Sequence, residues 1–312
     1  MGPEQAIKQL KIDDAFPIGD IDDILPGLIE GRERVYSSMG KDQRFDQRVM
    51  DWVKVVRGKA RQGAQPPGEF LVLDQLLNEM RLIKSAMEIK LMEKAGAISA
   101  EAHKRAMAIC RPGLNEYHLE AEIVHEFVRS GSRAAAYNNI VAAGKNACIL
   151  HYIENNSLIK DGDLILIDAG CEYEYYAADI TRTFPANGKF NKEQKALYEI
   201  CLDAQLEAIK AVKPGASWDA PHNATVRVIT AGLLKLGLLK GELKKLIKSE
   251  AYKDFYMHRA GHWLGIDVHD VGDYKIDGKW RLMEPGMVTT IEPGIYVAPD
   301  NKKVDKKWRG IG

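Results

Sequence analysis

The stretch that decides the fold runs from Asp161 to Pro185 and reads Asp-Gly-Asp-Leu-Ile-Leu-Ile-Asp-Ala-Gly-Cys-Glu-Tyr-Glu-Tyr-Tyr-Ala-Ala-Asp-Ile-Thr-Arg-Thr-Phe-Pro. Its apolar run at 164–167 is too short for a helix and lies between glycines, which predicts a buried β-strand. Residues 180–184 are rich in β-branched side chains, which favour a returning strand. The stretch therefore predicts a β-hairpin.

Two aspartates, Asp168 and Asp179, flank the turn of this hairpin. If the turn is centred between Tyr173 and Glu174, the two aspartates lie directly opposite each other, with Cβ atoms about 5 Å apart. Two carboxylates at that distance repel unless a proton or a cation lies between them. A single aspartate at a strand end more often caps a turn or stays solvated, but two in register favour a metal site.

A second copy of the strand occurs later in the chain. Residues 286–294 read Gly-Met-Val-Thr-Thr-Ile-Glu-Pro-Gly and align without a gap with residues 162–170, with Glu292 on Asp168 and glycine on glycine. Each half also contains a predicted helix that ends in Pro-Gly and is followed by another helix. We therefore expect an internal duplication, with two similar halves that face each other and bring both acids to a shared centre.

The composition excludes several classes of protein. The 312 residues allow one large or two smaller domains. Lys plus Arg equal Asp plus Glu at 44 each, so no net charge attracts nucleic acid or a membrane surface. The apolar runs fall well short of the ~20 residues that cross a bilayer. Four cysteines without paired-ligand spacing argue against disulfides and structural zinc, and they favour a cytoplasmic location.

The chain divides into two predicted domains. Residues 1–80 are short for an independent α/β domain and are expected to form part of one. Residues 81–312 form the second domain, which opens on a capping box at residues 85–88 (Ser-Ala-Met-Glu). Further helices are expected after Asn115, Asn191 and Ser217.

Three histidines, His258, His262 and His269, lie in the glycine-punctuated segment 257–272. A helical zinc-protease motif needs Glu directly after the first His of a His-x-x-x-His pair. Arg259 occupies that position, which excludes the motif. A lone histidine is usually structural, but three in a chain with two hairpin aspartates and an Ile-Glu-Pro-Gly segment favour a metal site.

The donor set contains two aspartates, one glutamate and one histidine, with no cysteine. Such oxygen-rich sites suit Mn²⁺, with Co²⁺ or Zn²⁺ as alternatives. Bridging carboxylates hold two ions about 3.5–4 Å apart in hydrolytic two-metal centres. The donor set therefore predicts two divalent ions that lower the pKa of a shared water and polarise a carbonyl.

Four motifs carry a resemblance to a known family: Asp-Ala-Gly at 168–170, Ala-Asp-Ile-Thr-Arg-Thr-Phe at 178–184, Gly-His-Trp-Leu-Gly-Ile-Asp-Val-His-Asp at 261–270 and Ile-Glu-Pro-Gly at 291–294. They resemble the metal motifs of the M24 pita-bread metallopeptidases, closest to the bacterial aminopeptidase P (Xaa-Pro aminopeptidase) branch. The likeness implies an α+β fold with duplicated helix-helix-strand halves and a curved antiparallel sheet covered by helices.

The resemblance implies a role for each matching metal ligand. Asp168 would chelate one metal, Asp179 would bridge the two, and His262 would bind the other. Glu292 would be both a ligand and the general base for a hydroxide that bridges the metals and attacks the scissile carbonyl.

The resemblance also implies substrate contacts. His258 and His269 would steady the tetrahedral intermediate or the substrate carbonyl. His151 would contact the substrate near its prolyl residue and act in catalysis. Tyr137 is expected to line the pocket.

The family has a fifth ligand, a bridging glutamate, on a strand that follows the Arg-Gly-Ile-Gly found here at residues 309–312. This chain stops at Gly312, so the resemblance implies truncation at both ends, with the last strand missing and the second metal weakened. Family members often form dimers or tetramers through the amino-terminal domain, which implies a homo-oligomer.

We hypothesise a metal-dependent exopeptidase that cleaves between an amino-terminal residue and a following proline. Proline lacks the amide hydrogen and fixes φ, so such a substrate needs a dedicated pocket. One alternative is a prolidase, which shares these motifs but accepts only dipeptides. The other is a pita-bread module that binds peptides or proteins without turnover, because the fifth ligand is missing; a metal analysis that finds no ions would favour it.

Overall fold

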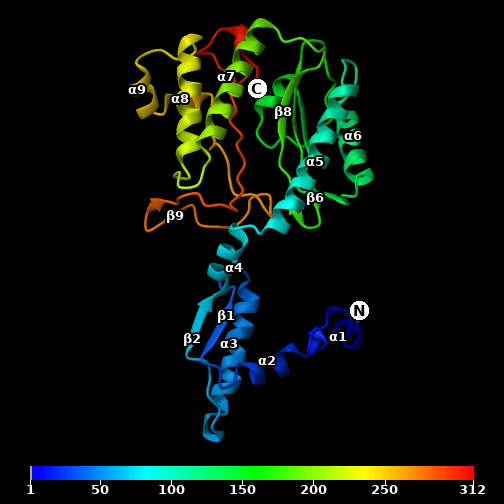
Figure 1. The fold of residues 1–312 in the computed structure, drawn as a ribbon, viewed down its shortest axis with the longest axis vertical. Helices are drawn as coiled ribbons and strands as arrows, with labels where there is room; N and C mark the ends of the chain where they lie inside the picture. Colours follow the sequence, from blue (N-terminus) through cyan, green and yellow to red (C-terminus); the bar gives the residue numbers. More distant parts are fainter. Residues whose placement is uncertain (1) are drawn as a thin grey trace. The chain divides into compact units, whose positions relative to one another are not determined.

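The structure is a computed structural model that describes residues 2–312, and the chain separates into two compact units, residues 1–78 and 79–312. Figure 1 shows the elements of both units. None of the described helices combines the length and the apolar character needed to cross a bilayer.

The first unit is a small mixed α/β structure. Strands β1 and β2 pair in parallel, and the core beneath them centres on Trp52 and Val56. Helix α3 begins after Asp42, whose side chain accepts hydrogen bonds from two backbone amides of the first turn. The elements are α1 (Pro3–Leu10), η1 (Ile18–Asp20), α2 (Ile21–Ile29), β1 (Arg34–Ser37), α3 (Gln43–Gly58), η2 (Ala60–Gln62), β2 (Glu69–Val72) and α4 (Leu73–Leu82), the last of which continues into the second unit.

The second unit contains two antiparallel helix pairs, α5 with α6 and α7 with α8, on opposite sides of its strands and extended segments (Figure 1). Ser85 and Glu88 form the predicted capping box at the start of α5, and Asn191 forms another with Gln194 at the start of α7. The helices are α5 (Ala86–Ile109), α6 (Glu116–Arg129), η3 (Gly144–Cys148), α7 (Lys192–Ala211), α8 (Ala220–Lys235), α9 (Leu243–Lys248), η4 (Ala251–Asp254) and η5 (Lys306–Trp308).

The strands of the second unit form short antiparallel sheets. The central sheet has the order β4-β5-β8, and its buried face packs against α5 and α6 through one apolar cluster. A second sheet has the order β3-β6-β7. The strands are β3 (Ala134–Ala135), β4 (Ile140–Ala143), β5 (Leu164–Asp168), β6 (Cys171–Tyr173), β7 (Tyr176–Ala177), β8 (Thr181–Pro185), β9 (Lys275–Ile276) and β10 (Lys279–Trp280).

The predicted hairpin is present, but its predicted register is wrong. Asp168 pairs with Thr181, not with Asp179, because the turn is centred one residue later than expected. The turn residues Glu174 and Tyr175 both have positive φ, 48° and 70°, as a two-residue type I′ turn requires. The pairing shift is two residues, so both aspartates remain on one face as diagonal neighbours, and such neighbours lie about 7–8 Å apart.

The segment aligned with β5, residues 286–294, pairs in a less regular way. Residues 288–292 run antiparallel to residues 260–264, with hydrogen bonds from Leu264 N to Val288 O (3.1 Å) and from Thr290 N to His262 O (3.0 Å). The only residue pair of this ladder that qualifies as a β-bridge among residues 2–312 is Trp263 with Thr289. We call residues 260–264 and 288–292 the second ladder.

Candidate metal centre

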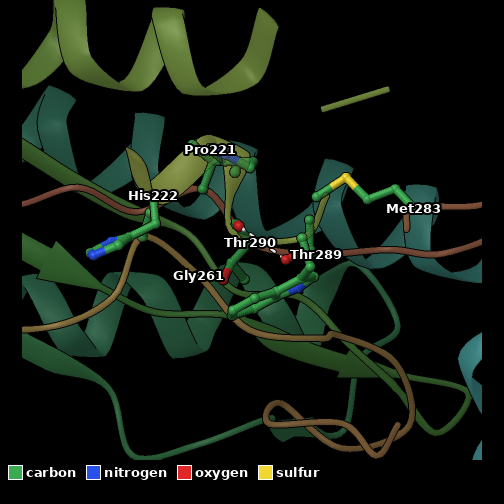
Figure 2. A pocket seen from close by; sticks show the side chains of 9 residues that line it. Pro221, His222, Gly261, Met283, Thr289 and Thr290 are labelled. Carbon is green, nitrogen blue, oxygen red and sulfur yellow. Dashed lines mark hydrogen bonds between the residues drawn. The ribbon is translucent and has the colours of Figure 1, made fainter. Parts of the chain in front are cut away.

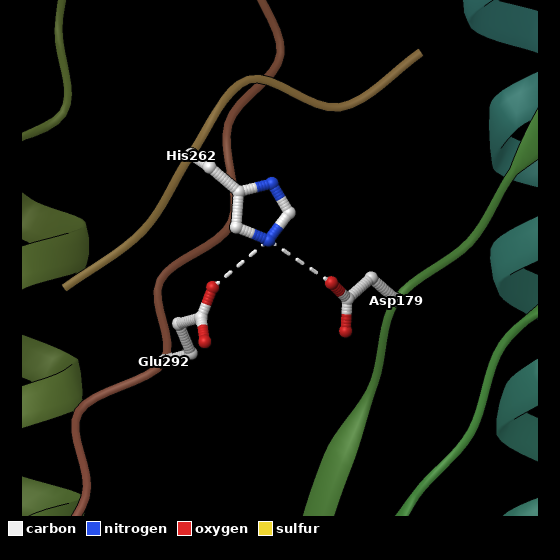
Figure 3. A group of neighbouring side chains, drawn as sticks. All are labelled: Asp179, His262 and Glu292. Carbon is white, nitrogen blue, oxygen red and sulfur yellow. Dashed lines mark ion pairs between the residues drawn. The ribbon is translucent and has the colours of Figure 1, made fainter. Parts of the chain in front are cut away.

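Three side chains from distant parts of the chain meet at one point (Figure 3). The Nε2 atom of His262 lies 3.2 Å from Oδ2 of Asp179 and 3.1 Å from Oε1 of Glu292. One ligand atom from each residue lies within 4.8 Å of the other two. Asp179 comes from the hairpin and the other two come from the second ladder, so the two halves of the unit meet at this cluster.

Tyr137 joins Asp168 to the cluster. Its hydroxyl donates to Oδ1 of Asp168 at 2.5 Å and lies 3.1 Å from Oδ1 of Asp179. Residues 134–135 pair with β6 and residues 140–143 with β5, and two extra residues between them break the register. A bulge of this kind redirects side chains, and here it accompanies a tyrosine whose hydroxyl contacts both carboxylates, beyond the pocket-lining position expected for it.

Burial and mutual repulsion perturb the acids. Burial and then the neighbouring Asp179 carboxylate raise the pKa of Asp168 to about 7. Burial opposes protonation of His262, but its hydrogen bonds with Asp179 and Glu292 outweigh this and raise its pKa to about 10. Burial alone would raise the pKa of Glu292, yet hydrogen bonds from His262 and Thr290 lower it. Positive charge is therefore strongly favoured at this point.

The residues present fit a divalent cation. The Nδ1 atom of His262 lies 2.9 Å from the backbone oxygen of Trp263, so it donates there and Nε2 faces the carboxylates. This is the usual arrangement of a metal-binding imidazole, whose other nitrogen donates to a fixed acceptor. A cation bound by Nε2 and the two carboxylates would replace the proton that otherwise holds these groups together.

Close backbone approaches fix both sides of the cluster. A Cβ on Gly170 would lie 1.7 Å from the backbone oxygen of Ala178, next to Asp179. A Cβ on Gly261 would lie 2.0 Å from the backbone oxygen of Thr290. Each glycine therefore permits a contact that any side chain would block.

Thr290 was missed by the sequence analysis. Its Oγ1 accepts a hydrogen bond from the backbone amide of His262 at 3.0 Å and donates to Oε1 of Glu292 at 2.7 Å. It orients one carboxylate and ties it to the backbone of the histidine. The residue stands two positions before Glu292, on the same face of an extended segment, which is the only indication that the sequence contains.

The other predicted histidines lie at different places. The His269 ring is 4.3 Å from the His262 ring at 76°, so it borders the cluster. His258 Nε2 lies 3.0 Å from the Tyr296 hydroxyl. His151 is exposed with φ of 55°, and among residues 2–312 no hydrogen bond of its side chain links it to the carboxylates.

A buried carboxylate shapes the segment that carries His151. Glu116 is fully buried and accepts hydrogen bonds from the Tyr152 hydroxyl (2.8 Å) and from the Ala143 amide (2.7 Å). The carboxylate accepts four hydrogen bonds in all, so its position is fixed. The position of His151 thus depends on a residue 35 positions earlier in the chain.

A small cavity lies beside the second ladder (Figure 2). Its volume is about 10 Å³, which is room for about one water molecule. It is too small for a peptide. The residues that line it are Trp218, Pro221, His222, Ala260, Gly261, Met283, Thr289, Thr290 and Ile291.

Comparison with known proteins identifies the family. Residues 90–312 match the profile described as metallopeptidase family M24. The whole chain is 46% identical to the Xaa-Pro aminopeptidase of Escherichia coli and 45% identical to that of Haemophilus influenzae, and it covers 70% of each.

Solved structures show the same fold. The aminopeptidase PepP of Pseudomonas aeruginosa superposes with a TM-score of 0.97 at 65% identity, over all of this chain and 70% of that one. A zinc-substituted E. coli aminopeptidase P in complex with product superposes with a TM-score of 0.95 at 46% identity. The predicted α+β pita-bread fold is confirmed.

Proposed function

The chain belongs to metallopeptidase family M24, and from this premise we propose how it cleaves the bond between an amino-terminal residue and a following proline. It is a metal-dependent Xaa-Pro aminopeptidase, as its identity to such enzymes over its whole length shows. The observation that carries the proposal is the convergence of Asp179, His262 and Glu292 within 4.8 Å.

We propose that Asp168, Asp179, His262 and Glu292 hold two Mn²⁺ ions. Mostly carboxylate oxygen with one imidazole nitrogen suits this ion, and Co²⁺ or Zn²⁺ fit the same donors. Bound there, the cations would lower the pKa of a water toward neutrality and polarise the scissile carbonyl.

The protein groups then position the substrate and move its protons. Glu292, with its lowered pKa and its Thr290 hydrogen bond, accepts a proton from the attacking water and passes it to the proline nitrogen as the C–N bond breaks. His269, beside His262, donates to the oxygen of the scissile carbonyl as charge develops on it.

A pocket for proline would lie around His258. Its ring packs edge-on against Tyr256, with centroids 5.0 Å apart, and its Nε2 lies near the Tyr296 hydroxyl. Tyr256 is fully buried behind His258, so the partly exposed rings of His258 and Tyr296 would face the pyrrolidine ring, which offers no amide hydrogen to recognise. We propose that His151 and Tyr137 complete the substrate contacts from the other half.

Three broader assignments are part of this proposal. Residues 81–312 would form the pita-bread catalytic domain, and residues 1–80 part of an amino-terminal α/β domain. The protein would work in the cytoplasm on peptides with proline at the second position. It would assemble as a homo-oligomer.

The test is hydrolysis of Xaa-Pro peptides with added Mn²⁺ by the wild type, by Asp179→Asn and by a control, Asp161→Asn. Asp161 lies in the turn just before β5, is exposed and accepts a hydrogen bond from Asn187. We expect Asp179→Asn to lose activity by at least a hundredfold, because it removes a charged metal ligand. Full activity in Asp179→Asn would refute the proposed site.

A second comparison separates the related activities. A tripeptide and a dipeptide, each with proline second, distinguish an aminopeptidase from a prolidase, which would cleave only the dipeptide. Metal analysis of the purified protein addresses a binding module, since two ions per chain support catalysis.

A further inference from the structure

We propose that the buried ion pair of Lys84 and Asp270 is a latch that sets His262 and His269 in place relative to Asp179. Lys84 and Asp270 are then positioning residues for the metal centre. The inference rests on the proposed function for its consequence in catalysis, but its geometry concerns the chain alone.

The pair is thoroughly buried. Lys84 Nζ lies 2.9 Å from Asp270 Oδ2, and each side chain is only 1% exposed. The other carboxylate oxygen accepts a hydrogen bond from Arg81 at 2.5 Å. Both oxygens of Asp270 are therefore held by cations from the segment just before α5.

The loop between the two histidines closes around this carboxylate. The Asp270 amide donates to the backbone oxygen of Trp263 at 2.9 Å, so the two ends of the loop are joined. A Cβ on Gly265 would lie 2.0 Å from Asp270 Oδ2, which shows that the loop backbone packs directly on the carboxylate. His262 immediately precedes this closed loop and His269 is its penultimate residue. The carboxylate therefore fixes the separation and orientation of the two rings.

The same cluster joins the two halves that supply the metal ligands. The Gly265 oxygen accepts a hydrogen bond from the amide of Ala177 at 2.8 Å, two residues before Asp179. The backbone amide of Lys84 donates to the Gly286 oxygen at 2.8 Å, just before the second ladder. A shift of the Lys84–Asp270 pair would thus displace the histidines relative to the hairpin aspartate.

Stability alone does not account for such a pair. Replacing a buried ion pair with neutral groups of similar size is often neutral or stabilising, because the cost of removing both charges from water disappears. A role in positioning predicts that the neutral replacement folds but binds metal less well. One experiment can therefore distinguish a role in stability from a role in positioning the metal ligands.

The experiment compares the wild type with the double variant Lys84→Met/Asp270→Asn, which removes the two charges of the buried pair and leaves Arg81 paired with Asp267 at 2.8 Å. The matched control is Glu79→Gln/Arg281→Met. Arg281 is also buried, at 8% side-chain exposure, and it forms a two-pronged ion pair with Glu79 in the same unit, but neither residue belongs to the histidine loop. The measurements are thermal unfolding without metal, Mn²⁺ affinity by calorimetry, and kcat and KM on an Xaa-Pro tripeptide.

We expect Lys84→Met/Asp270→Asn to unfold near the temperature of the control, to bind Mn²⁺ about tenfold more weakly and to lose kcat by about 10–100-fold. Mn²⁺ affinity and kcat within twofold of the control would overturn the proposal. If the double variant does not fold, the single variant Lys84→Met tests the proposal by the same measurements. In that variant Arg81 still pairs with Asp270, so the carboxylate keeps one cationic partner. An inactive wild type would refute the proposed function, whereas the Mn²⁺ affinities would still test the latch.

Discussion

The two halves of the second unit hold their metal-binding side chains by different means. The hairpin half carries Asp168 at the end of β5 and Asp179 between β7 and β8, and its strands pack against α5 and α6 through a large apolar cluster. The other half carries His262 and Glu292 on the second ladder, where only one residue pair of the described chain forms a β-bridge. The hairpin carboxylates thus lie on or beside a packed sheet, whereas the histidine segment has one β-bridge and a smaller apolar cluster around Trp263, together with polar contacts.

This difference indicates which half of the site contributes to stability and which contributes mainly to metal binding. Strand residues such as Ile165 and Ile167 are fully buried, so the hairpin cannot move without disturbing the core. The histidine loop is held by Thr290 and by the Lys84–Asp270 pair. We therefore expect changes in the hairpin to reduce stability and metal binding together. Changes in the second ladder should reduce mainly metal binding.

The largest effect should come from alanine at the two close-approach glycines. In Gly170→Ala the new Cβ meets the backbone of a packed sheet, which cannot give way, so unfolding free energy should fall by about 3 kcal/mol. For a unit of this size that corresponds to a loss of about 6–12 °C in Tm. Activity should fall at least a hundredfold, because even about 1 Å of displacement has that effect.

Gly261→Ala tests the other half in the same way. Its Cβ also meets backbone, at Thr290, but the two segments of the second ladder share only one β-bridge among the described residues, so we expect them to separate more easily. We expect a similar loss of activity with less than half the fall in Tm, measured by calorimetric unfolding. Equal Tm losses in both variants would contradict the proposed difference between the halves.

The sequence was sufficient for two features whose determinants lie close together in the chain. The capping box at Ser85 and the buried strand at 164–167 were predicted correctly, because their determinants lie within a few positions. Asp168 and Asp179 share a face despite the wrong register, since a shift of two residues preserves the alternation of a strand.

Features without a recognisable local pattern, and features set by tertiary contacts, could not be predicted. The turn uses Glu174 and Tyr175 in left-handed conformations, without the Asn-Gly pattern that identifies such turns. The contacts of Tyr137 follow from a bulge whose position depends on pairing with two different strands. The partners of Asp270 are Lys84 and Arg81, which lie more than 180 residues away in the sequence, and no local sequence pattern predicts them.

The next largest effect is the pH dependence of Mn²⁺ affinity. It distinguishes the two halves because each contributes a different titrating group. A metal must displace the protons bound to its ligands. The pKa is raised to about 7 for Asp168 and to about 10 for His262. The Mn²⁺ association constant should therefore rise about a hundredfold per pH unit below 7, where two protons leave, and about tenfold per unit between 7 and 10.

Calorimetric titration between pH 5.5 and 9 measures this dependence. In Asp168→Asn the Mn²⁺ association constant should rise by about tenfold per pH unit over the whole range, without a change of slope near pH 7. The metal-free protein should show the opposite trend in stability, because both pKa values are raised above their unfolded values of 3.8 and 6.5. That stability is fully present below the unfolded values and is lost as the pH rises through about 7 and then about 10. A slope that does not change near pH 7 in the wild type would contradict the proton release assigned to Asp168.

The smallest effect should come from Tyr137→Phe, which keeps the ring and removes the hydroxyl shared by the two hairpin carboxylates. We expect Mn²⁺ affinity to fall about tenfold, as is typical when a hydrogen bond to a metal ligand is lost. The hydrogen bond from Tyr137 lowers the pKa of Asp168, so the change of slope should also move above pH 7. Tyr175→Phe is the control, because Tyr175 is 74% exposed in the same hairpin. If the two variants bind Mn²⁺ alike, the packed sheet alone orients the carboxylates; a selective loss in Tyr137→Phe would show that even the hairpin half needs a polar contact.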